Sequence, residues 1–535
     1  MNRYSHMGAA LSALTRLKRL RWLLALAGIG LLVWPTQVFS QTNGEVQWSS
    51  PQFLGDGWWQ SIAIDRQGNV HVGWYGSSDP KINEAGADVF NYTRRSLDGQ
   101  WTPVNNVLYT GTGGLTIRNS LALTSDGMLH LAFRSGVYHS FASAYGLSAE
   151  NVHSWSEPVA IDDTGYYLSM MADNQDVLHL VTSERLKTGV KTGITNAELN
   201  PCILCHDLFY RRSTDGGQSW SDPVPISIEP TTGSDRMDIF QGASGRIYID
   251  WDEGLDWYIG RGNAQDVRIV YSDDDGLTWS PPIILDGGNL IDRKPIQIAA
   301  VELRDGSLMV VWRYNTDADR NIYYQLSSDI GKTWTAPQAI PGMVAQIADD
   351  TTLDDYNLII DKIGTIHLFA VGQPDLQSTS NAALFDVAYR QGLWLPPQRI
   401  FYSNDQRPEW PKAVLGPQND IHLSWFIRGT GRDPRTGKKL ANTDILKVYY
   451  SHLPGILPLE ATQVFAPTRT PFPTATVFQS LESTPTPFPT IVVVDTDTSV
   501  QTEDQYASQT LLGGLIAAAA FCAGIVIFIR MRRGG

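Results

Sequence analysis

The octapeptide STDGGQSW, residues 213–220, recurs with the same skeleton as SDDDGLTW at 272–279 and SSDIGKTW at 327–334. The shared pattern is S-x-D-x-G-x-[ST]-W, and SLDGQW at 96–101 is a shortened copy. In such a turn the carboxylate accepts bonds from amides, the glycine takes a positive φ, and the tryptophan packs the turn onto a sheet. The motif therefore predicts tight turns between strands, organised by Asp98, Asp215, Asp274 and Asp329.

Outward from these turns, the chain repeats a second unit, in which an Asp/Gly turn precedes a run of alternating apolar residues. Such alternation is typical of a half-buried strand. The copies of this unit begin at Asp65, Ser125, Asp173, Ser244, Asp305, Asp361 and Gln418. Repeats of this length, each with several short strands, predict an all-β fold, a β-propeller of about seven blades.

A tryptophan followed closely by proline marks one further strand of each repeat except the last. These tryptophans are Trp101, Trp155, Trp220, Trp279, Trp334 and Trp394. The last repeat ends at residues 447–451 without this element, and the missing piece reads WSSP at 48–51. We therefore expect the N-terminal strand to complete the last blade, which closes the ring and leaves no long exposed edge.

The S-x-D-x-G-x-[ST]-W turns look like the Asp boxes of the sialidase (neuraminidase) superfamily, and the resemblance covers residues 45–455. In that family the boxes lie at the blade periphery and are structural. The resemblance implies a retaining glycosidase with a tyrosine nucleophile, an activating glutamate, an aspartic acid/base and three arginines that bind a carboxylate. Residues 58–61 read WWQS where the family has an arginine element, and no late Tyr-Glu pair is evident. Family domains also have six blades, so we assign no catalytic residue.

The centre of the ring is the expected place for a ligand, because funnels are the default pockets of propellers. To find it, we align the repeats on the histidine of each inner strand, or its equivalent, and step back twelve positions. The positions reached are Trp59, Arg118, Tyr167, Arg236, Gln297, Asp355 and Trp410, with Arg293 as a substitute for Gln297. Aromatic faces stack on sugar rings and arginines bind carboxylates, so this set predicts a site for an acidic glycan or another anionic polymer.

Two alternatives to this ligand site stay open. Arg236 and Arg293 each follow an aspartate directly, which is typical of a structural ion pair. Asp235, Asp238, Asp292 and Glu409 are the nearby acids. Arg268 and Arg320, which precede two of the turns, are the other arginines that could bind a carboxylate.

Residues 201–206, PCILCH, match the C-x-x-C-H pattern of c-type haem attachment. A disulfide between Cys202 and Cys205 is the favoured interpretation in an oxidising exterior, and a metal held with His206 is a third. Acidic residues at 317–319 and 349–355 offer oxygens to calcium, but no complete calcium loop is present. We therefore predict no cofactor.

Histidines recur once per repeat at one position, so they cannot converge on a single metal ion. We interpret them as blade-packing residues. They are His71, His130, His179, His367 and His422.

The two ends of the chain predict export and membrane anchoring. A basic stretch at 16–21 and an apolar run at 22–34 indicate a signal peptide spanning 1–40, with an uncleaved anchor as the alternative. Residues 456–510 are rich in proline and threonine, which predicts an extended stalk. The apolar run 511–529 is long enough to cross a bilayer, and the basic tail 530–535 is expected in the cytoplasm.

This organisation puts the propeller, residues 41–455, at the outer surface of a cell membrane. The chain has 535 residues and a net charge of −14, which argues against a nucleic-acid partner. Our first hypothesis is a module that binds glycans or other extracellular polymers. The alternatives are an exo-acting glycoside hydrolase on acidic sugars and a scaffold for a protein partner.

Overall fold

The computed structural model describes residues 47–76, 88–110, 118–134, 136–184, 206–227, 233–254, 264–285, 293–347, 356–378, 381–429 and 446–455. Within these ranges the chain forms β-strands and a short 3-10 turn, η1, at Val152–Ser154. The strands assemble into seven antiparallel sheets, which we call blades one to seven in chain order. The predicted all-β propeller of about seven blades is confirmed.

Blades one to five each contain four strands in sequence order. Blade one is β2 (Trp58–Ile64), β3 (Val70–Gly76), β4 (Asp88–Arg95) and β5 (Asn105–Thr110). Blade two is β6 (Asn119–Leu123), β7 (Met128–Arg134), β8 (Val137–Ser143) and β9 (Val159–Asp162). Blade three is β10 (Gly165–Ala172), β11 (Leu178–Glu184), β12 (Asp207–Ser213) and β13 (Val224–Ser227). Blade four is β14 (Ser234–Gln241), β15 (Ile247–Glu253), β16 (Asp266–Ser272) and β17 (Ile283–Leu285). Blade five is β18 (Pro295–Glu302), β19 (Leu308–Tyr314), β20 (Ile322–Ser327) and β21 (Gln338–Ala339).

Blades six and seven depart from this simple order. Blade six contains β22 (Val344–Ala345), β23 (Asn357–Ile360), β24 (Ile366–Gln373), β25 (Ala383–Arg390), β26 (Leu393–Trp394) and β27 (Gln398–Phe401). The short strands β22 and β23 both pair with β24, which corresponds to the second strand of the other blades. The short strands β26 and β27 both pair with β25, which corresponds to the third. Blade seven is β28 (Gln406–Leu415), β29 (Ile421–Gly429), β30 (Leu446–Leu453) and β1 (Gln52–Asp56).

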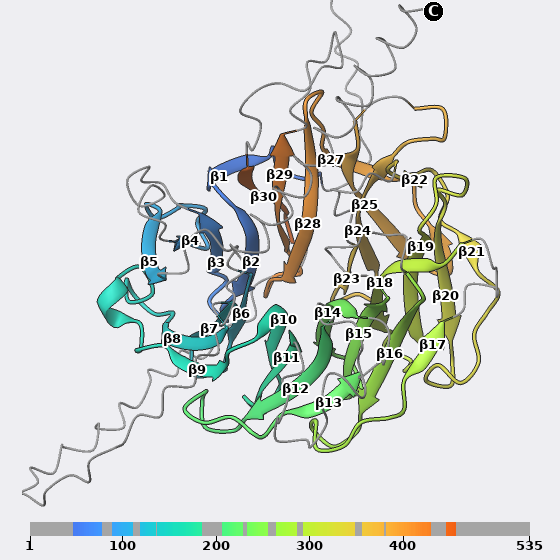
Figure 1. Ribbon diagram of the computed structural model, residues 1–535. Helices are drawn as coiled ribbons and strands as arrows, with labels where there is room; N and C mark the ends of the chain where they lie inside the picture. The colour runs from blue at the N-terminus through green and yellow to red at the C-terminus, as the bar shows by residue number, and fades with distance from the viewer. Residues whose placement is uncertain are drawn as a thin grey trace, which may run out of the picture. The chain divides into compact units, whose positions relative to one another are not determined.

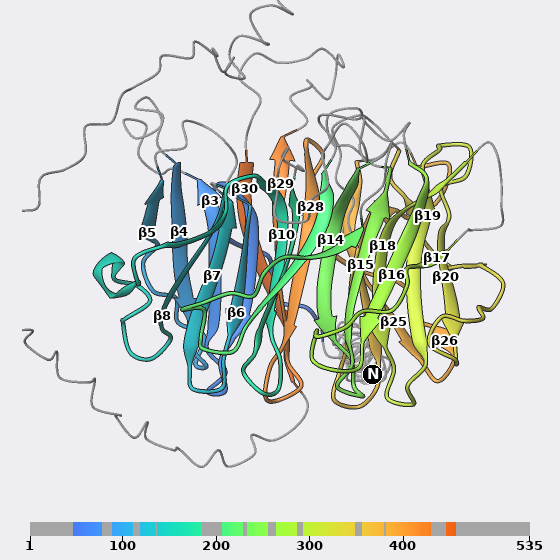
Figure 2. The same ribbon diagram turned by 60° about the horizontal axis from the view of Figure 1, so that its bottom comes forward.

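The first strand of each blade faces a common centre (Figure 1). Neighbouring first strands contact each other around the whole circle, in the order β2, β6, β10, β14, β18, β23, β28 and back to β2. Seen from the side, the strands of different blades run roughly along the axis of this ring (Figure 2). The arrangement is therefore a closed ring whose innermost strands form the wall of its centre.

The ring is closed by the start of the described chain, as the WSSP element predicted. β1 pairs antiparallel with β30, in a register that runs from Gln52 opposite Tyr450 to Asp56 opposite Lys447. Just before β1, the Ser49 amide donates to the His452 carbonyl over 2.8 Å. Blade seven thus takes three strands from one end of the domain and one from the other, and β1 covers the edge of β30.

The recurring histidines lie on the second strand of their blades, not on the innermost strand as expected. Each is buried, and each contacts a polar side chain on the third strand of its own blade. The heavy-atom distances are 2.6 Å for His71–Tyr92, 2.6 Å for His179–Tyr210, 2.5 Å for His422–Tyr450, 3.0 Å for His367–Asp386 and 3.1 Å for His130–His139. Their predicted role in blade packing is confirmed.

The tryptophans of the Trp-Pro elements pack across the blade boundaries. Each of six rings contacts an aromatic side chain of the preceding blade, with blade seven preceding blade one. The centroid distances are 4.9 Å for Trp101–Tyr450, 6.4 Å for Trp155–Tyr92, 5.5 Å for Trp220–His139, 4.8 Å for Trp279–Tyr210, 5.3 Å for Trp394–Tyr324 and 5.6 Å for Trp48–Phe369. The sheet that each tryptophan packs against is therefore that of the neighbouring blade, which ties the ring together.

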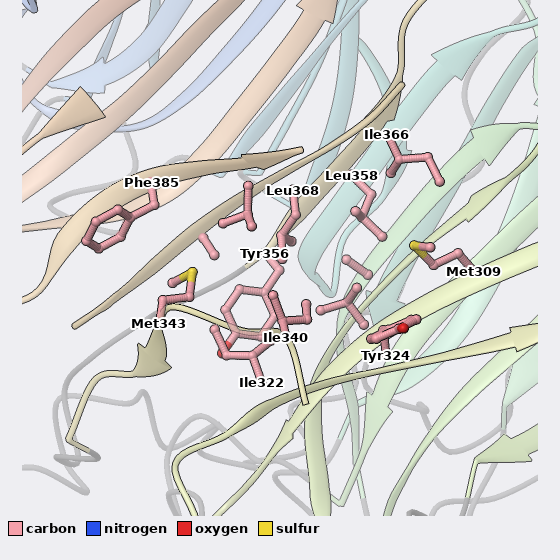
Figure 3. Packing of buried hydrophobic residues seen from close by; sticks show 14 of the residues in the cluster. Met309, Ile322, Tyr324, Ile340, Met343, Tyr356, Leu358, Ile366, Leu368 and Phe385 are labelled. Atoms are coloured by element: carbon pink, nitrogen blue, oxygen red, sulfur yellow. The ribbon is translucent and has the colours of Figure 1, made fainter. Parts of the chain in front are cut away.

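Apolar cores fill the wedges between blades. The core between blades five and six combines Met309, Ile322 and Tyr324 with Tyr356 and Leu368, and Figure 3 shows these side chains interleaved. Other large side chains that are fully buried recur on the second strands. They are Trp74, Trp251, Trp312 and Trp425. Because packing of this kind lies on both faces of the sheets, each blade depends on its neighbours for stability.

The His130–His139 pair predicts an acid limit to stability. Burial lowers the pKa of His130 from 6.5 to about 4 and that of His139 to about 3. In the unfolded chain both rings take up protons below pH 6.5, whereas in the folded chain they stay neutral until much lower pH. The free energy of unfolding should therefore fall by about 2 kcal/mol as the pH drops from 6.5 towards 4, after a discount for coupling between the rings.

The substitution His139→Tyr tests this pH dependence, because tyrosine occupies the equivalent place in blades one, three and seven. We expect urea unfolding of this variant to show a shallower loss of stability between pH 6.5 and 4.5 than wild type. Identical pH profiles for the two proteins would contradict the assignment.

Several sequence predictions concern residues outside the described ranges. They are the signal peptide at 1–40, the stalk at 456–510, the membrane helix at 511–529, the tail at 530–535, Asp355, and Cys202 with Cys205. In the described part of the chain, no helix has the length and apolar character needed to span a membrane.

Candidate functional site

The innermost strands of blades one, four, five and seven share a left-handed bulge at the positions that the repeat alignment selected. Trp59, Arg236, Gln297 and Trp410 have φ values of 52°, 56°, 59° and 56°. At each of them the pairing with the second strand shifts register. A positive φ in a bulky residue costs free energy, and it persists only where the surrounding structure holds it. These aligned positions are therefore structurally equivalent. They lie on the innermost strands, whereas the histidines used for the alignment lie on the second strands.

Neighbouring blades hold these bulges in place through hydrogen bonds. The Asp252 carboxylate on β15 accepts the amides of Gln297 and Ile298 in the next blade, at 2.9 and 3.1 Å. In the same way, the Asn119 side chain donates to the Trp59 carbonyl over 2.5 Å. These bonds stabilise the bulge and fix the orientation of the side chains around the ring centre.

Half of the ring centre is filled by an aromatic cluster made of predicted site residues. The Trp59 ring lies 4.7 Å from Trp410 and 6.0 Å from Tyr167, measured between centroids. The Arg118 guanidinium stacks on these rings, 4.5 Å from Trp59 and 4.0 Å from Tyr167. Trp59, Tyr167 and Arg118 are buried, and burial raises the pKa of the Tyr167 phenol. This half of the centre is packed and offers a ligand little beyond the Trp410 ring.

The other half of the centre contains a cavity of about 200 Å³, which we call the axial cavity. Its wall is formed by the innermost strands of blades four to seven, together with part of β15. The polar and aromatic side chains that line it include Arg236, Asp238, Asp250, Gln297, Trp410 and Lys412. The repeat alignment predicted three of these six, and Asp238 was named as a nearby acid.

An ion pair crosses the axial cavity two positions beyond the bulges. Lys412 Nζ on β28 lies 2.8 Å from Asp238 Oδ2 on β14, and the Ser169 hydroxyl donates to Asp238 Oδ1 over 2.6 Å. Side-chain exposures of 27% for Lys412 and 36% for Asp238 show that the pair still meets solvent. Burial alone would raise the pKa of Asp238, but the Lys412 charge and the hydrogen bonds outweigh it, and the pKa is lowered. Asp238 is therefore ionised at neutral pH.

Asp250 has the opposite protonation behaviour. It lies on β15 directly opposite Asp238 in the strand register, and only 1% of its surface is exposed. Burial, followed by the nearby Asp238 charge, raises its pKa well above the ordinary value of 3.8. The cavity thus combines one carboxyl group whose pKa is lowered with another whose pKa is raised.

The remaining arginine candidates are engaged away from the axial cavity. Arg293 forms an ion pair with Asp319 and stacks on Tyr314 at 4.3 Å. Asp292, the partner that the sequence suggested for Arg293, lies outside the described residues. Arg268 Nε donates to Asp266 over 2.6 Å. Arg320 is buried and donates to the Gln373 side chain over 2.7 Å. Of the arginines considered as carboxylate ligands, Arg236 is the one that lines the cavity.

The S-x-D-x-G-x-[ST]-W turns show the hydrogen bonds that their sequence predicts. In the copy at 327–334, Ser327 donates to Asp329 over 2.8 Å, and Asp329 accepts the Thr333 amide and hydroxyl over 2.8 and 2.7 Å. These bonds lower the pKa of Asp329 to about 2. Asp215, Asp274 and Asp98 accept bonds from turn residues in the same manner. All four lie in turns that follow the third strand, so they organise hairpins and take no part in the axial cavity.

His206, the described member of the C-x-x-C-H motif, is buried and stacks on Tyr166 with 4.9 Å between ring centroids. Across the described ranges, no group of three or more His, Cys, Asp and Glu side chains is placed to hold a metal ion.

Sequence reasoning missed Asp250 and Lys412. Both belong to positions with a simple pattern: Lys412 and Asp238 each lie two residues after a bulge, and Asp250 is the cross-strand neighbour of Asp238. Moving two residues on from the aligned bulge positions, to the next side chains that face the axis, would have reached both members of the Asp238–Lys412 ion pair. An acidic residue in the middle of an otherwise apolar strand, as in IYIDWDE at 247–253, is the signal that could have indicated Asp250.

Comparison with known proteins gives a consistent family signal. A family model described as a BNR repeat-like domain matches residues 205–357. A sialidase of Clostridium perfringens is 28% identical over 158 residues, which are 25% of this chain and 41% of that sialidase. The chain therefore matches less than half the length of this relative.

Solved structures show a similar fold at low sequence identity. An ulvan lyase of a polysaccharide lyase family, bound to a GlcA(1-4)Rha3S unit, matches with a TM-score of 0.51 and 11% identity, over 76% of this chain and 97% of the lyase. A leech intramolecular trans-sialidase matches with a TM-score of 0.40 and 13% identity, over 76% and 93% of the two chains. At these identities the comparison with the lyase bears on the fold alone.

Proposed function

We propose that this chain, a BNR-repeat β-propeller similar to sialidases, binds a glycan in the axial cavity. The observation that carries the proposal is the cavity itself, where the half-buried Trp410 ring stands beside the Asp238–Lys412 ion pair. An aromatic face stacks on the apolar face of a sugar, while charged groups bond to its hydroxyls. A cavity of about 200 Å³ is smaller than the usual pocket for a drug-sized ligand, which favours one sugar residue at a time.

The known proteins that resemble this chain support a carbohydrate ligand. One is a sialidase, and a solved propeller of similar fold is a polysaccharide lyase bound to a sugar unit. We propose further that the propeller faces the cell exterior, carried by the stalk at 456–510 and the helix at 511–529. Digestion of intact cells with an external protease should release the propeller if this topology is right.

Binding to a glycan array tests the proposal. The full-length chain, in detergent, is applied to an array of sialylated, uronate-containing and neutral glycans, and hits are measured by calorimetry. We expect Trp410→Ala to weaken binding about tenfold, since an aromatic contact of this kind contributes roughly 0.5–1.5 kcal/mol. The control Tyr109→Ala removes a ring that is 62% exposed on the outer strand β5 and should bind as wild type does.

Two results would contradict a glycan site in the axial cavity. One is a folded chain that binds no glycan on the array. The other is a Trp410→Ala variant that binds glycan as tightly as the Tyr109→Ala control does.

A further inference from the structure

The charges that line the axial cavity do not favour an anion. Among the described residues, its wall contains the acidic side chains Asp238, Asp250 and Asp252 and the basic side chains Arg236 and Lys412. Two positive groups therefore stand against two or three negative ones, depending on whether Asp250 carries its proton. Sites that bind carboxylates or sulfates gather an excess of positive charge. The described wall of the axial cavity has no such excess.

Lys412 is a cation beside the Trp410 ring, and it already forms an ion pair. Its Nζ atom lies 2.8 Å from Asp238 Oδ2 and 5.2 Å from the centroid of the ring. A sugar stacked on Trp410 would place its substituents next to both members of this ion pair. An acidic sugar would have to separate Lys412 from Asp238 and then lie beside the released carboxylate, so repulsion would oppose the attraction.

A sugar hydroxyl meets the same ion pair without this conflict. A hydroxyl donates one hydrogen bond and accepts others, so neighbouring hydroxyls can donate to a carboxylate and accept from an ammonium group. Side-chain exposures of 27% for Lys412 and 36% for Asp238 leave room for such bonds. The Ser169 hydroxyl donates to the other oxygen of Asp238 over 2.6 Å, which fixes the pair from a third blade. The intact pair is therefore suited to a neutral diol.

We propose that the axial cavity selects neutral sugar residues, and that the Asp238–Lys412 ion pair excludes acidic ones. The inference rests on the proposed glycan binding and names the class of sugar bound there. It departs from the acidic ligand that the sequence predicted, because that prediction relied on arginines. Of these, Arg118 stacks within the aromatic cluster and Arg293 pairs with Asp319. Asp238 and Lys412 are the residues that determine the specificity.

Removing the Asp238 charge should reverse the preference. Asp238→Asn keeps the size of the side chain and an oxygen that can accept from Ser169, but it removes the carboxylate that Lys412 pairs with. We expect wild type to bind a glycan ending in a neutral hexose about tenfold more tightly than the matching uronate, and Asp238→Asn to bind that uronate about tenfold more tightly than wild type does, the scale of one charge-assisted hydrogen bond.

Removing the Lys412 charge should shift the preference in another direction. Lys412→Met retains an unbranched side chain, while Asp238 loses this ion pair. A sugar with a protonated amino group can then take the place of the ammonium group. We expect Lys412→Met to bind a glycan ending in a 2-amino-2-deoxyhexose about tenfold more tightly than wild type does. Because the two variants gain affinity for sugars of opposite charge, a general loosening of the cavity would not produce both results.

Calorimetry on matched glycans measures these preferences. The full-length chain, in detergent, is titrated with glycans that share a core and end in a neutral hexose, the matching uronate or the matching amino sugar. Each titration is repeated at low and high salt, because screening weakens the binding of a charged sugar far more than that of a neutral one. Asp273→Asn is the control, since it removes a carboxylate that pairs with Arg246 outside the cavity and is 61% exposed. It should keep the wild-type preferences.

The outcomes separate this inference from the proposed function. Glycan binding in which wild type prefers the uronate, or binds uronate and hexose equally, would overturn the selection of neutral sugars and leave the binding site standing. A neutral preference that both variants retain would overturn the assignment to the ion pair. Absence of binding to every glycan would overturn both proposals. Circular dichroism checks that each variant is folded, and the shift in either folded variant is sufficient to decide.

Discussion

Replacing Trp48 with alanine is expected to lower the free energy of unfolding by about 3 kcal/mol. The Trp48 ring packs edge-on against Phe369 of blade six, and its Nε1–H donates to Asp386 over 3.0 Å. Loss of the ring removes buried apolar area, and loss of the donor removes a hydrogen bond to a charged group, worth about 1.5–3 kcal/mol. The tryptophan lies just before β1, so the variant also weakens the closure of the ring.

Urea unfolding followed by tryptophan fluorescence and far-UV circular dichroism measures this effect. Trp48→Phe retains the contact with Phe369 but not the hydrogen bond, and should lose about half as much stability. Phe53→Ala is the control, because Phe53 follows on β1 and is 48% exposed. A Trp48→Ala protein as stable as the Phe53→Ala protein would show that the closure contributes little.

Gly276→Ala is expected to destabilise the propeller by about 3–5 kcal/mol. Gly276 has a φ of +80°, and a Cβ atom there would overlap the hydroxyl of Tyr210 in blade three. Tyr210 cannot rotate away without breaking its 2.6 Å bond to His179. The left-handed backbone costs an alanine about 1–2 kcal/mol, and overpacking against a held side chain typically adds 1–3 kcal/mol.

Gly245→Ala isolates the backbone part of this effect. Gly245 has a φ of +90° in a turn of blade four, with no atom within 4 Å of the position that a Cβ would take. Its substitution should therefore cost only the backbone strain. Equal losses of stability for the two variants, measured by thermal and urea unfolding, would contradict the close packing of the turn at 272–279 on blade three.

Much of the fold is predictable from sequence, because repetition makes a weak local signal strong. One alternating strand after a turn is ambiguous, whereas the same unit from Asp65 to Gln418 indicates a propeller. Ring closure was also predictable, because the element missing after residue 451 occurs at Trp48. The order of strands within a blade was less accessible: the histidines mark the second strand, and the innermost strand has a weaker pattern because its bulge interrupts the alternation.

The candidate site was only partly predictable, since it depends on contacts between blades. Alignment of the repeats brought Trp59, Tyr167 and Trp410 to one centre, which the structure shows in contact. The same procedure says nothing about which residues of different blades pair across that centre. The bond from Lys412 to Asp238 joins residues 174 positions apart, and the raised pKa of Asp250 follows from burial, which no local pattern encodes.

The place of β30 inside blade seven bears on how the domain resists mechanical force. The last described residue is Gly455, just beyond β30, so tension on the downstream chain acts first on that strand. An edge strand would peel away after one ladder of hydrogen bonds broke, but β30 is bonded to β29 on one side and to β1 on the other. Two ladders must rupture before it leaves the sheet. The N-terminal strand therefore acts as a latch against unravelling from the C-terminal end.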